Sequence, residues 1–219
     1  MDQVPQSLLF LGIIPALILM FISLKGYDGY YKDKTIFLTF IVGLVIGVIA
    51  VIIESFTVRV GLVYIALFPV LEQLSKTIVL NIGRFHGKKE TPIYGLSIGL
   101  AFGSIFIPSS LILLNAQGVF DNLTIAIVLV YALGIILIHG ATGVCIGYGV
   151  YKYSLFKYLI YAIVLYIPVT ALAYISTYAT ISYLQIAVLP YGLILYWYFT
   201  TRILSKIKEQ KGRKKSEKD

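Results

Sequence analysis

Residues 36–53 have the sequence IFLTFIVGLVIGVIAVII, an apolar run that contains no charged side chain. An α-helix rises about 1.5 Å per residue, so it crosses the hydrocarbon of a bilayer in about 20 residues. A run of this length and composition therefore predicts a transmembrane helix.

Similar runs continue the pattern on both sides. The predicted spans are 8–24, 36–53, 60–82, 94–114, 123–150, 157–177 and 181–199. The first is short and the fifth is long, so we expect tilt or extension beyond the bilayer to adjust both. No glycine- and serine-rich linker or long internal repeat divides the chain. The predicted fold is an all-α transmembrane bundle of about seven spans. It forms one domain, residues 1–201, followed by a basic tail, residues 202–219.

Composition excludes a water-soluble protein. The 219 residues are 59% hydrophobic and 13% charged, whereas soluble domains are about 45–50% apolar and about 25% charged. A soluble core of this size cannot bury so much apolar surface. The net charge of +8 comes from cations in short segments between apolar runs and in the tail. This distribution argues against a nucleic-acid partner.

The positive charges also predict the orientation. With the N-terminus outside, sixteen of the eighteen Lys and Arg residues lie in cytoplasmic segments and only Arg59 lies in an outer one. This sorting follows the positive-inside rule and predicts a cytoplasmic tail on a multi-pass plasma-membrane protein. The tail is either solvated or in contact with anionic lipid headgroups.

Glycines recur at four-residue spacing on three predicted spans. The positions are Gly43 and Gly47, Gly95, Gly99 and Gly103, and Gly143 and Gly147. Such ridges let helix backbones approach closely in a membrane.

A few polar residues lie where lipid makes them costly, which marks them as paired or functional. Glu72, Gln73 and Lys76 lie near the middle of one span, and His139 lies at a similar depth on another. These four residues predict a polar cavity inside the bundle. A structural ion pair between Glu72 and Lys76, four residues apart on one helical face, is the alternative.

Two other polar residues need no functional site to explain them. Glu54 ends a span close to Arg59, so we expect an ion pair at headgroup level, and His86 in the basic loop should be solvated. The chain has two histidines and no zinc-protease motif, nucleotide-binding loop or serine-nucleophile motif. We therefore expect neither a metal nor a cofactor.

Three short blocks between residues 60 and 150 carry a resemblance. They are PVLEQLSK at 69–76, YGLSIGLAF at 94–102, and HGATG at 139–143 followed by Gly147. In this order they resemble the P-x-x-E-E-x-x-K, Y-G-x-x-x-G-x-G-F and H-A-x-x-G-x-x-x-G segments of the PrsW family. This family of intramembrane proteases is related to the CAAX-processing and bacteriocin-processing membrane proteases.

The resemblance implies an intramembrane endopeptidase that acts on a membrane-embedded or membrane-proximal peptide. Glu72 would activate water, and His139 would orient that water or stabilise the tetrahedral intermediate. Lys76 would set the charge of Glu72, and Gln73 would donate to the oxyanion.

This chain departs from the family pattern at three places. Gln73 replaces the second glutamate of the pair. Phe106 and Ile107 stand where an acidic residue is usual, and the apolar stretch around Ile167 and Pro168 replaces a polar position. A catalytically silent relative that binds membrane-protein helices is therefore an alternative. A small-solute or ion carrier is another, although no inverted repeat supports it.

Overall fold

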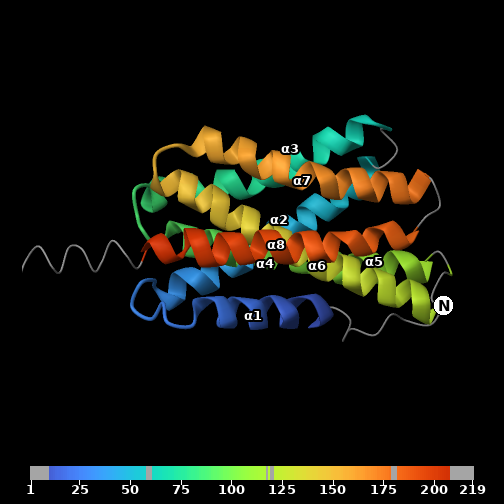
Figure 1. Cartoon of the computed structure of the whole chain (residues 1–219), viewed down its shortest axis with the longest axis horizontal. Coiled ribbons are helices and arrows are strands. Elements are labelled where there is room, and N and C mark those ends of the chain that lie inside the picture. Colours follow the sequence, from blue (N-terminus) through green and yellow to red (C-terminus); the bar gives the residue numbers. More distant parts are fainter. Residues whose placement is uncertain (1–9, 58–60, 117, 119–120, 179–181, 208–219) are drawn as a thin grey trace, which may run out of the picture.

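The computed structural model describes residues 10–57, 61–116, 118, 121–178 and 182–207, and the described part consists of helices and short connections, with no strand (Figure 1). The helices are α1 (Phe10–Leu24), α2 (Asp33–Thr57), α3 (Val63–Leu80), α4 (Thr91–Ser104), α5 (Phe106–Ala116), α6 (Asn122–Tyr151), α7 (Leu155–Tyr178) and α8 (Val188–Tyr198). Short 3-10 helices cover Gly83–Phe85 and Ser182–Ala187, and a π-helical turn covers Phe199–Ile203. Each of the seven predicted ranges thus contains helix.

The outer surface of the bundle identifies a helical membrane protein. Within the described ranges, five helical segments are long and apolar enough to cross a membrane, namely Asp33–Phe56, Val63–Leu80, Thr91–Ala116, Asn122–Tyr151 and Leu155–Ser176. Large apolar side chains point outward, with Phe56 84% exposed and Phe21 76% exposed. Soluble proteins rarely expose wide apolar patches, whereas lipid covers them without cost. The all-α membrane fold is confirmed at this level.

The connections gather at two ends of the bundle (Figure 1). The segments 25–32, 81–90 and 152–154 lie at one end, together with the C-terminal end of α8. The C-terminal ends of α2, α5 and α7 lie at the opposite end (Figure 1). The basic segments of the described chain therefore share one end.

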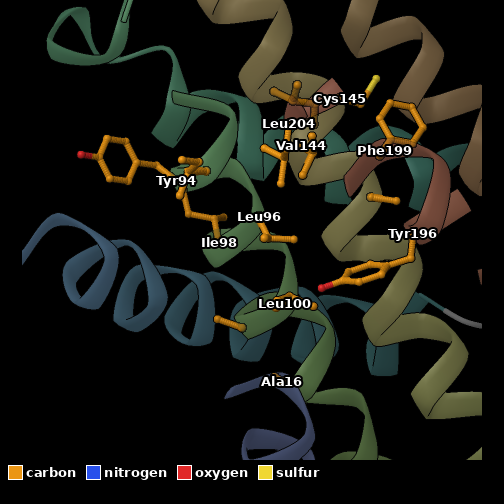
Figure 2. Close-up of a cluster of buried hydrophobic side chains, with 14 of the residues drawn as sticks. Ala16, Tyr94, Leu96, Ile98, Leu100, Val144, Cys145, Tyr196, Phe199 and Leu204 are labelled. Carbon is orange, nitrogen blue, oxygen red and sulfur yellow. The ribbon is translucent and has the colours of Figure 1, made fainter. Parts of the chain in front are cut away.

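Helix α4 occupies the centre of the bundle. Every residue of α4 is buried, and its most extensive contact is with α6, followed by α2. Figure 2 shows Leu96 and Leu100 of α4 among side chains from α6 and α8, with the Tyr196 ring extending toward α4. This central position allows α4 and α6 to hold a site between them.

The predicted glycine ridges lie at these central contacts. A Cβ atom at Gly147 of α6 would lie 2.7 Å from the carbonyl oxygen of Thr91, and one at Gly43 of α2 would lie 2.6 Å from that of Ile98. Cβ atoms at Gly95, Gly99 and Gly143 would also meet backbone carbonyls of the facing helix (α4 or α6). Glycine is required because the backbones themselves are in contact.

Two prolines shape the helices near the site. Pro69 lacks the N–H that would bond the carbonyl of Ile65, and the Thr170 hydroxyl of α7 donates to that carbonyl at 2.8 Å instead. Pro108 similarly removes the bond to the Ser104 carbonyl, and the helix breaks at Ile105 between α4 and α5. A neighbouring hydroxyl group thus replaces a lost backbone bond inside the membrane.

Three further predictions concern the periphery. Leu204 and Ile207 are buried, so helical packing continues beyond the predicted domain end at residue 201. Glu54 accepts a hydrogen bond from the Tyr64 hydroxyl, whereas its predicted partner Arg59 lies outside the described residues, as does the tail from residue 208. His86 is exposed, as predicted, and its ring contacts Asn81.

Candidate functional site

Helix α3 carries three of the four predicted site residues into the interior. Glu72 is 2% exposed, and Gln73 and Lys76 are fully buried. The fourth residue, His139, is fully buried on α6, in the stretch where that helix packs against α4. The four residues predicted to line a polar cavity are therefore interior residues, and their side chains are closed off from the surface.

Lys76 is directed at α6 rather than at Glu72. Its Nζ lies 3.1 Å from Nδ1 of His139 and donates to Oγ1 of Thr142 at 2.7 Å. The same ammonium group lies 5.5 Å from the centre of the Phe102 ring. Among the described residues Lys76 forms no ion pair with Glu72, although the two side chains are electrostatic neighbours. The predicted structural ion pair is therefore not formed.

Both ring nitrogens of His139 have a polar neighbour, and aromatic side chains pack against its ring. Its Nε2 lies 3.0 Å from the hydroxyl oxygen of Tyr166, opposite the contact with Lys76. Its ring centre lies 4.6 Å from that of Phe102, 4.7 Å from that of Tyr166 and 5.6 Å from that of Phe106, which is stacked on it. No ring nitrogen is left for a substrate or water, so His139 acts on its surroundings through its neighbours.

Tyr166 is a site residue that the sequence reasoning missed. It directly precedes Ile167 and Pro168, the apolar stretch that stands where the PrsW pattern has a polar position. Its hydroxyl lies 3.0 Å from Nε2 of His139 and is an electrostatic neighbour of the Glu72 carboxyl. A buried tyrosine hydroxyl usually needs a partner, which was a usable signal. That signal was hidden because the chain has 18 tyrosines.

Thr142 was present in the quoted block but had no predicted role. It follows His139 by one helical turn, accepts from Lys76 and donates to the carbonyl oxygen of His139 at 3.2 Å. The hydroxyl group therefore fastens the ammonium group of α3 to the backbone of α6.

Three buried polar atoms in this region have no hydrogen-bond partner among the described residues. They are Oε2 of Glu72 and both Oε1 and Nε2 of Gln73. Most buried polar groups are paired, and an unpaired one costs about 1–3 kcal/mol. The unused hydrogen-bonding capacity is concentrated on two consecutive residues, next to the network formed by Lys76, His139 and Tyr166.

Neither cavity recorded in the structure includes these residues. A groove of about 670 Å³ lies between α1 and α2 and is lined mainly by apolar side chains such as Leu17, Phe21 and Phe37. A smaller cavity of about 190 Å³ lies near the basic loops, at Lys32, Arg84 and Lys88. Within the described ranges no three His, Cys, Asp or Glu side chains are grouped as metal ligands would be.

The arrangement offers one buried carboxyl and one amide with free hydrogen-bonding atoms, supported by an ammonium, an imidazole and a phenol. A second carboxyl, Glu54, is an electrostatic neighbour of Glu72. Such a set of groups can bind a polar molecule and accept a proton from it. Comparisons with family models, with curated proteins and with solved structures give no match.

Proposed function

We propose that this chain is an intramembrane endopeptidase of the PrsW type, with Glu72 as the base that activates water. The observation that carries the proposal is the set of unpaired buried atoms on Glu72 and Gln73. A water molecule and a peptide carbonyl would supply the partners that these atoms lack. The resemblance of the three sequence blocks adds the reaction class.

In the proposed reaction, Oε2 of Glu72 takes a proton from water, whose oxygen adds to the carbonyl carbon of the scissile peptide bond. The Gln73 amide donates a hydrogen bond to the oxyanion that forms. The carbon–nitrogen bond then breaks, and the proton held by Glu72 passes to the leaving amine. His139 and Lys76 orient the carboxyl side of the site without touching the substrate.

We also propose that the chain crosses the plasma membrane seven times, with the N-terminus outside and the tail in the cytoplasm. Two observations support this topology. Lys and Arg residues are concentrated in alternate connections between the predicted spans. The basic connections that the structure describes share one end of the bundle (Figure 1). The cleaved peptide would then lie in or near the same membrane.

The proposal is tested by comparing the membrane proteomes of cells that express the full chain or its Glu72→Gln variant. New N-termini in or near transmembrane segments are labelled chemically and quantified by mass spectrometry. We expect fragments that depend on the wild-type chain and disappear with Glu72→Gln at equal membrane levels. Glu90→Gln, which changes a carboxyl in the α3–α4 connection, is the matched control and should keep them.

Two outcomes oppose the proposal in different ways. Fragments that persist with Glu72→Gln would show that Glu72 is not the base. The absence of wild-type-dependent fragments would favour the second candidate, a silent relative that binds membrane-protein helices. The complete burial of Glu72 and the amide at Gln73 favour that candidate. In an active enzyme Gln73→Glu would restore the family pair and raise cleavage, because paired carboxyls share protons.

A further inference from the structure

Four buried polar side chains form one row across α3, α6 and α7. Lys76 Nζ lies 3.1 Å from Nδ1 of His139, and Nε2 of His139 lies 3.0 Å from the Tyr166 hydroxyl. The Glu72 carboxyl is an electrostatic neighbour of that hydroxyl. All four residues are at most 2% exposed, so bulk water does not compete for these bonds.

The direction in which the hydrogen bonds of this row run depends on which ring nitrogen of His139 carries the proton. A neutral imidazole carries its hydrogen on one nitrogen and accepts on the other. If Lys76 donates to Nδ1, the ring proton is on Nε2 and is donated to the Tyr166 oxygen. The Tyr166 hydrogen is then free for the Glu72 carboxylate. With the opposite tautomer of His139 the row runs backwards, and Glu72 must carry a proton to complete it.

The surroundings of Lys76 favour one of these directions, and Thr142 is the first of them. Its hydroxyl has a single hydrogen, which it donates to the carbonyl oxygen of His139 at 3.2 Å. The Thr142 oxygen must therefore accept from Lys76, whose Nζ lies 2.7 Å away. The Lys76 nitrogen also lies 5.5 Å from the centre of the Phe102 ring, a position that suits a cation. A protonated Lys76 has three hydrogens and no lone pair, so it donates to Nδ1 of His139 as well as to Thr142.

We propose that Lys76 and Thr142 hold His139 as the tautomer protonated on Nε2, and that Tyr166 is a positioning residue that carries this direction to Glu72. The Tyr166 hydroxyl donates to the carboxylate and leaves Oε2, the unpaired oxygen, for water. Only this last consequence rests on the proposed endopeptidase activity. The tautomer and the row belong to the resting protein.

The chain offers a clean measurement, because it has only two histidines. His86 is exposed and distant from the site, so His86→Gln leaves His139 as the single histidine signal. The full chain is prepared in lipid nanodiscs with nitrogen-15-labelled histidine. Correlations between ring nitrogens and ring C–H protons then identify which nitrogen is protonated. We expect a protonated Nε2 and an unprotonated Nδ1.

Two variants test the neighbours of His139. Tyr166→Phe removes the acceptor of the Nε2 proton and should shift the Nε2 resonance. Tyr191→Phe is the matched control, because its hydroxyl also bonds α7, at the Leu165 carbonyl 2.7 Å away, but does not contact His139. Lys76→Met should cause loss of the single tautomer, with protonated Nδ1 appearing in the spectrum.

A protonated Nδ1 in the wild-type background, or equal spectra for Tyr166→Phe and Tyr191→Phe, would overturn the inference. Either result leaves the proteome comparison of Glu72→Gln intact, so the two proposals fail separately. Where cleavage is measured, Tyr166→Phe should lower kcat about 10- to 100-fold with little change in KM, as expected for a misplaced reacting group. Tyr191→Phe should leave kcat unchanged.

Discussion

A methyl group added at Gly147 of α6 would meet the backbone of α4 at three atoms. It would lie 2.7 Å from the carbonyl oxygen of Thr91, 2.8 Å from the Cα of Pro92 and 3.1 Å from its nitrogen. These atoms belong to a helix that is buried over its whole length. They can move only if α4 and α6 separate.

The size of the effect follows from the distances. Ordinary van der Waals contact begins at 3.4 Å, so the two helices would have to separate by about 0.7 Å. Overpacking of this kind costs about 1–3 kcal/mol. The gain of about 0.5–1 kcal/mol from alanine in a helix interior offsets part of this cost and leaves a loss of up to about 2.5 kcal/mol. For a chain of this length 1 kcal/mol corresponds to about 2–4 °C in melting temperature, so Gly147→Ala should melt up to about 10 °C lower.

Gly140→Ala is the matched control on the same helix. Its added methyl group would lie 2.9 Å from both Cδ2 of Leu100 and Cε2 of Tyr196. These are ends of side chains, which can rotate away. In addition, alanine gains about 0.5–1 kcal/mol over glycine in a helix interior. We therefore expect Gly140→Ala to melt close to the wild-type temperature.

Both variants are compared in one detergent, with unfolding followed by the fluorescence of Trp197, the single tryptophan, and by the size-exclusion profile. Equal melting temperatures for Gly147→Ala and Gly140→Ala would refute the argument that backbone contact between α4 and α6 requires glycine. A higher melting temperature for Gly147→Ala would show that helix propensity outweighs the close approach.

Three further perturbations test other parts of the structure. Thr170→Val removes the hydroxyl that replaces the bond lost at a proline and should cost about 1 kcal/mol, whereas Thr170→Ser should not; equal melting of the two would contradict this role. The Asp121 carboxylate caps α6, and hydrogen bonds led by the Thr124 hydroxyl lower its pKa below the ordinary 3.8. Its stabilisation is present above that value and lost as the pH falls through the lowered pKa, so Asp121→Asn should remove this part of the pH dependence of melting. A cysteine placed at Ser216 in a Cys145→Ala background should resist impermeant reagents on intact cells, and labelling from outside would show the proposed orientation to be wrong.

Much of the membrane fold could be predicted from the sequence because hydropathy and length are local properties. Runs such as residues 36–53 predicted most helices within a few residues, but the predicted span 94–114 is broken at Ile105 and the span 181–199 begins with a 3-10 helix before α8. The glycine spacing predicted where backbones meet. The cost of charge in lipid also pointed to Glu72, Lys76 and His139 as interior residues. Each of these inferences needs only the chain and its solvent.

Hydropathy could not predict which helix is central. Helices α2 and α4 are both apolar, yet Phe37 of α2 is 69% exposed while every residue of α4 is buried. A membrane interior and a protein interior are similarly apolar, so the pattern does not separate lipid-facing from buried sides. Packing between helices makes that choice.

The partners of the polar residues were also decided by tertiary structure. Sequence spacing favoured an ion pair between Glu72 and Lys76 on one helix, but Lys76 lies against His139 and Thr142 of α6. Tyr166 joins them from α7. The rotation of a helix about its axis selects which neighbours a side chain meets, and packing against the other helices sets that rotation. The residue types were therefore determined by the sequence alone, whereas the network between them exists only because three helices pack in this one arrangement.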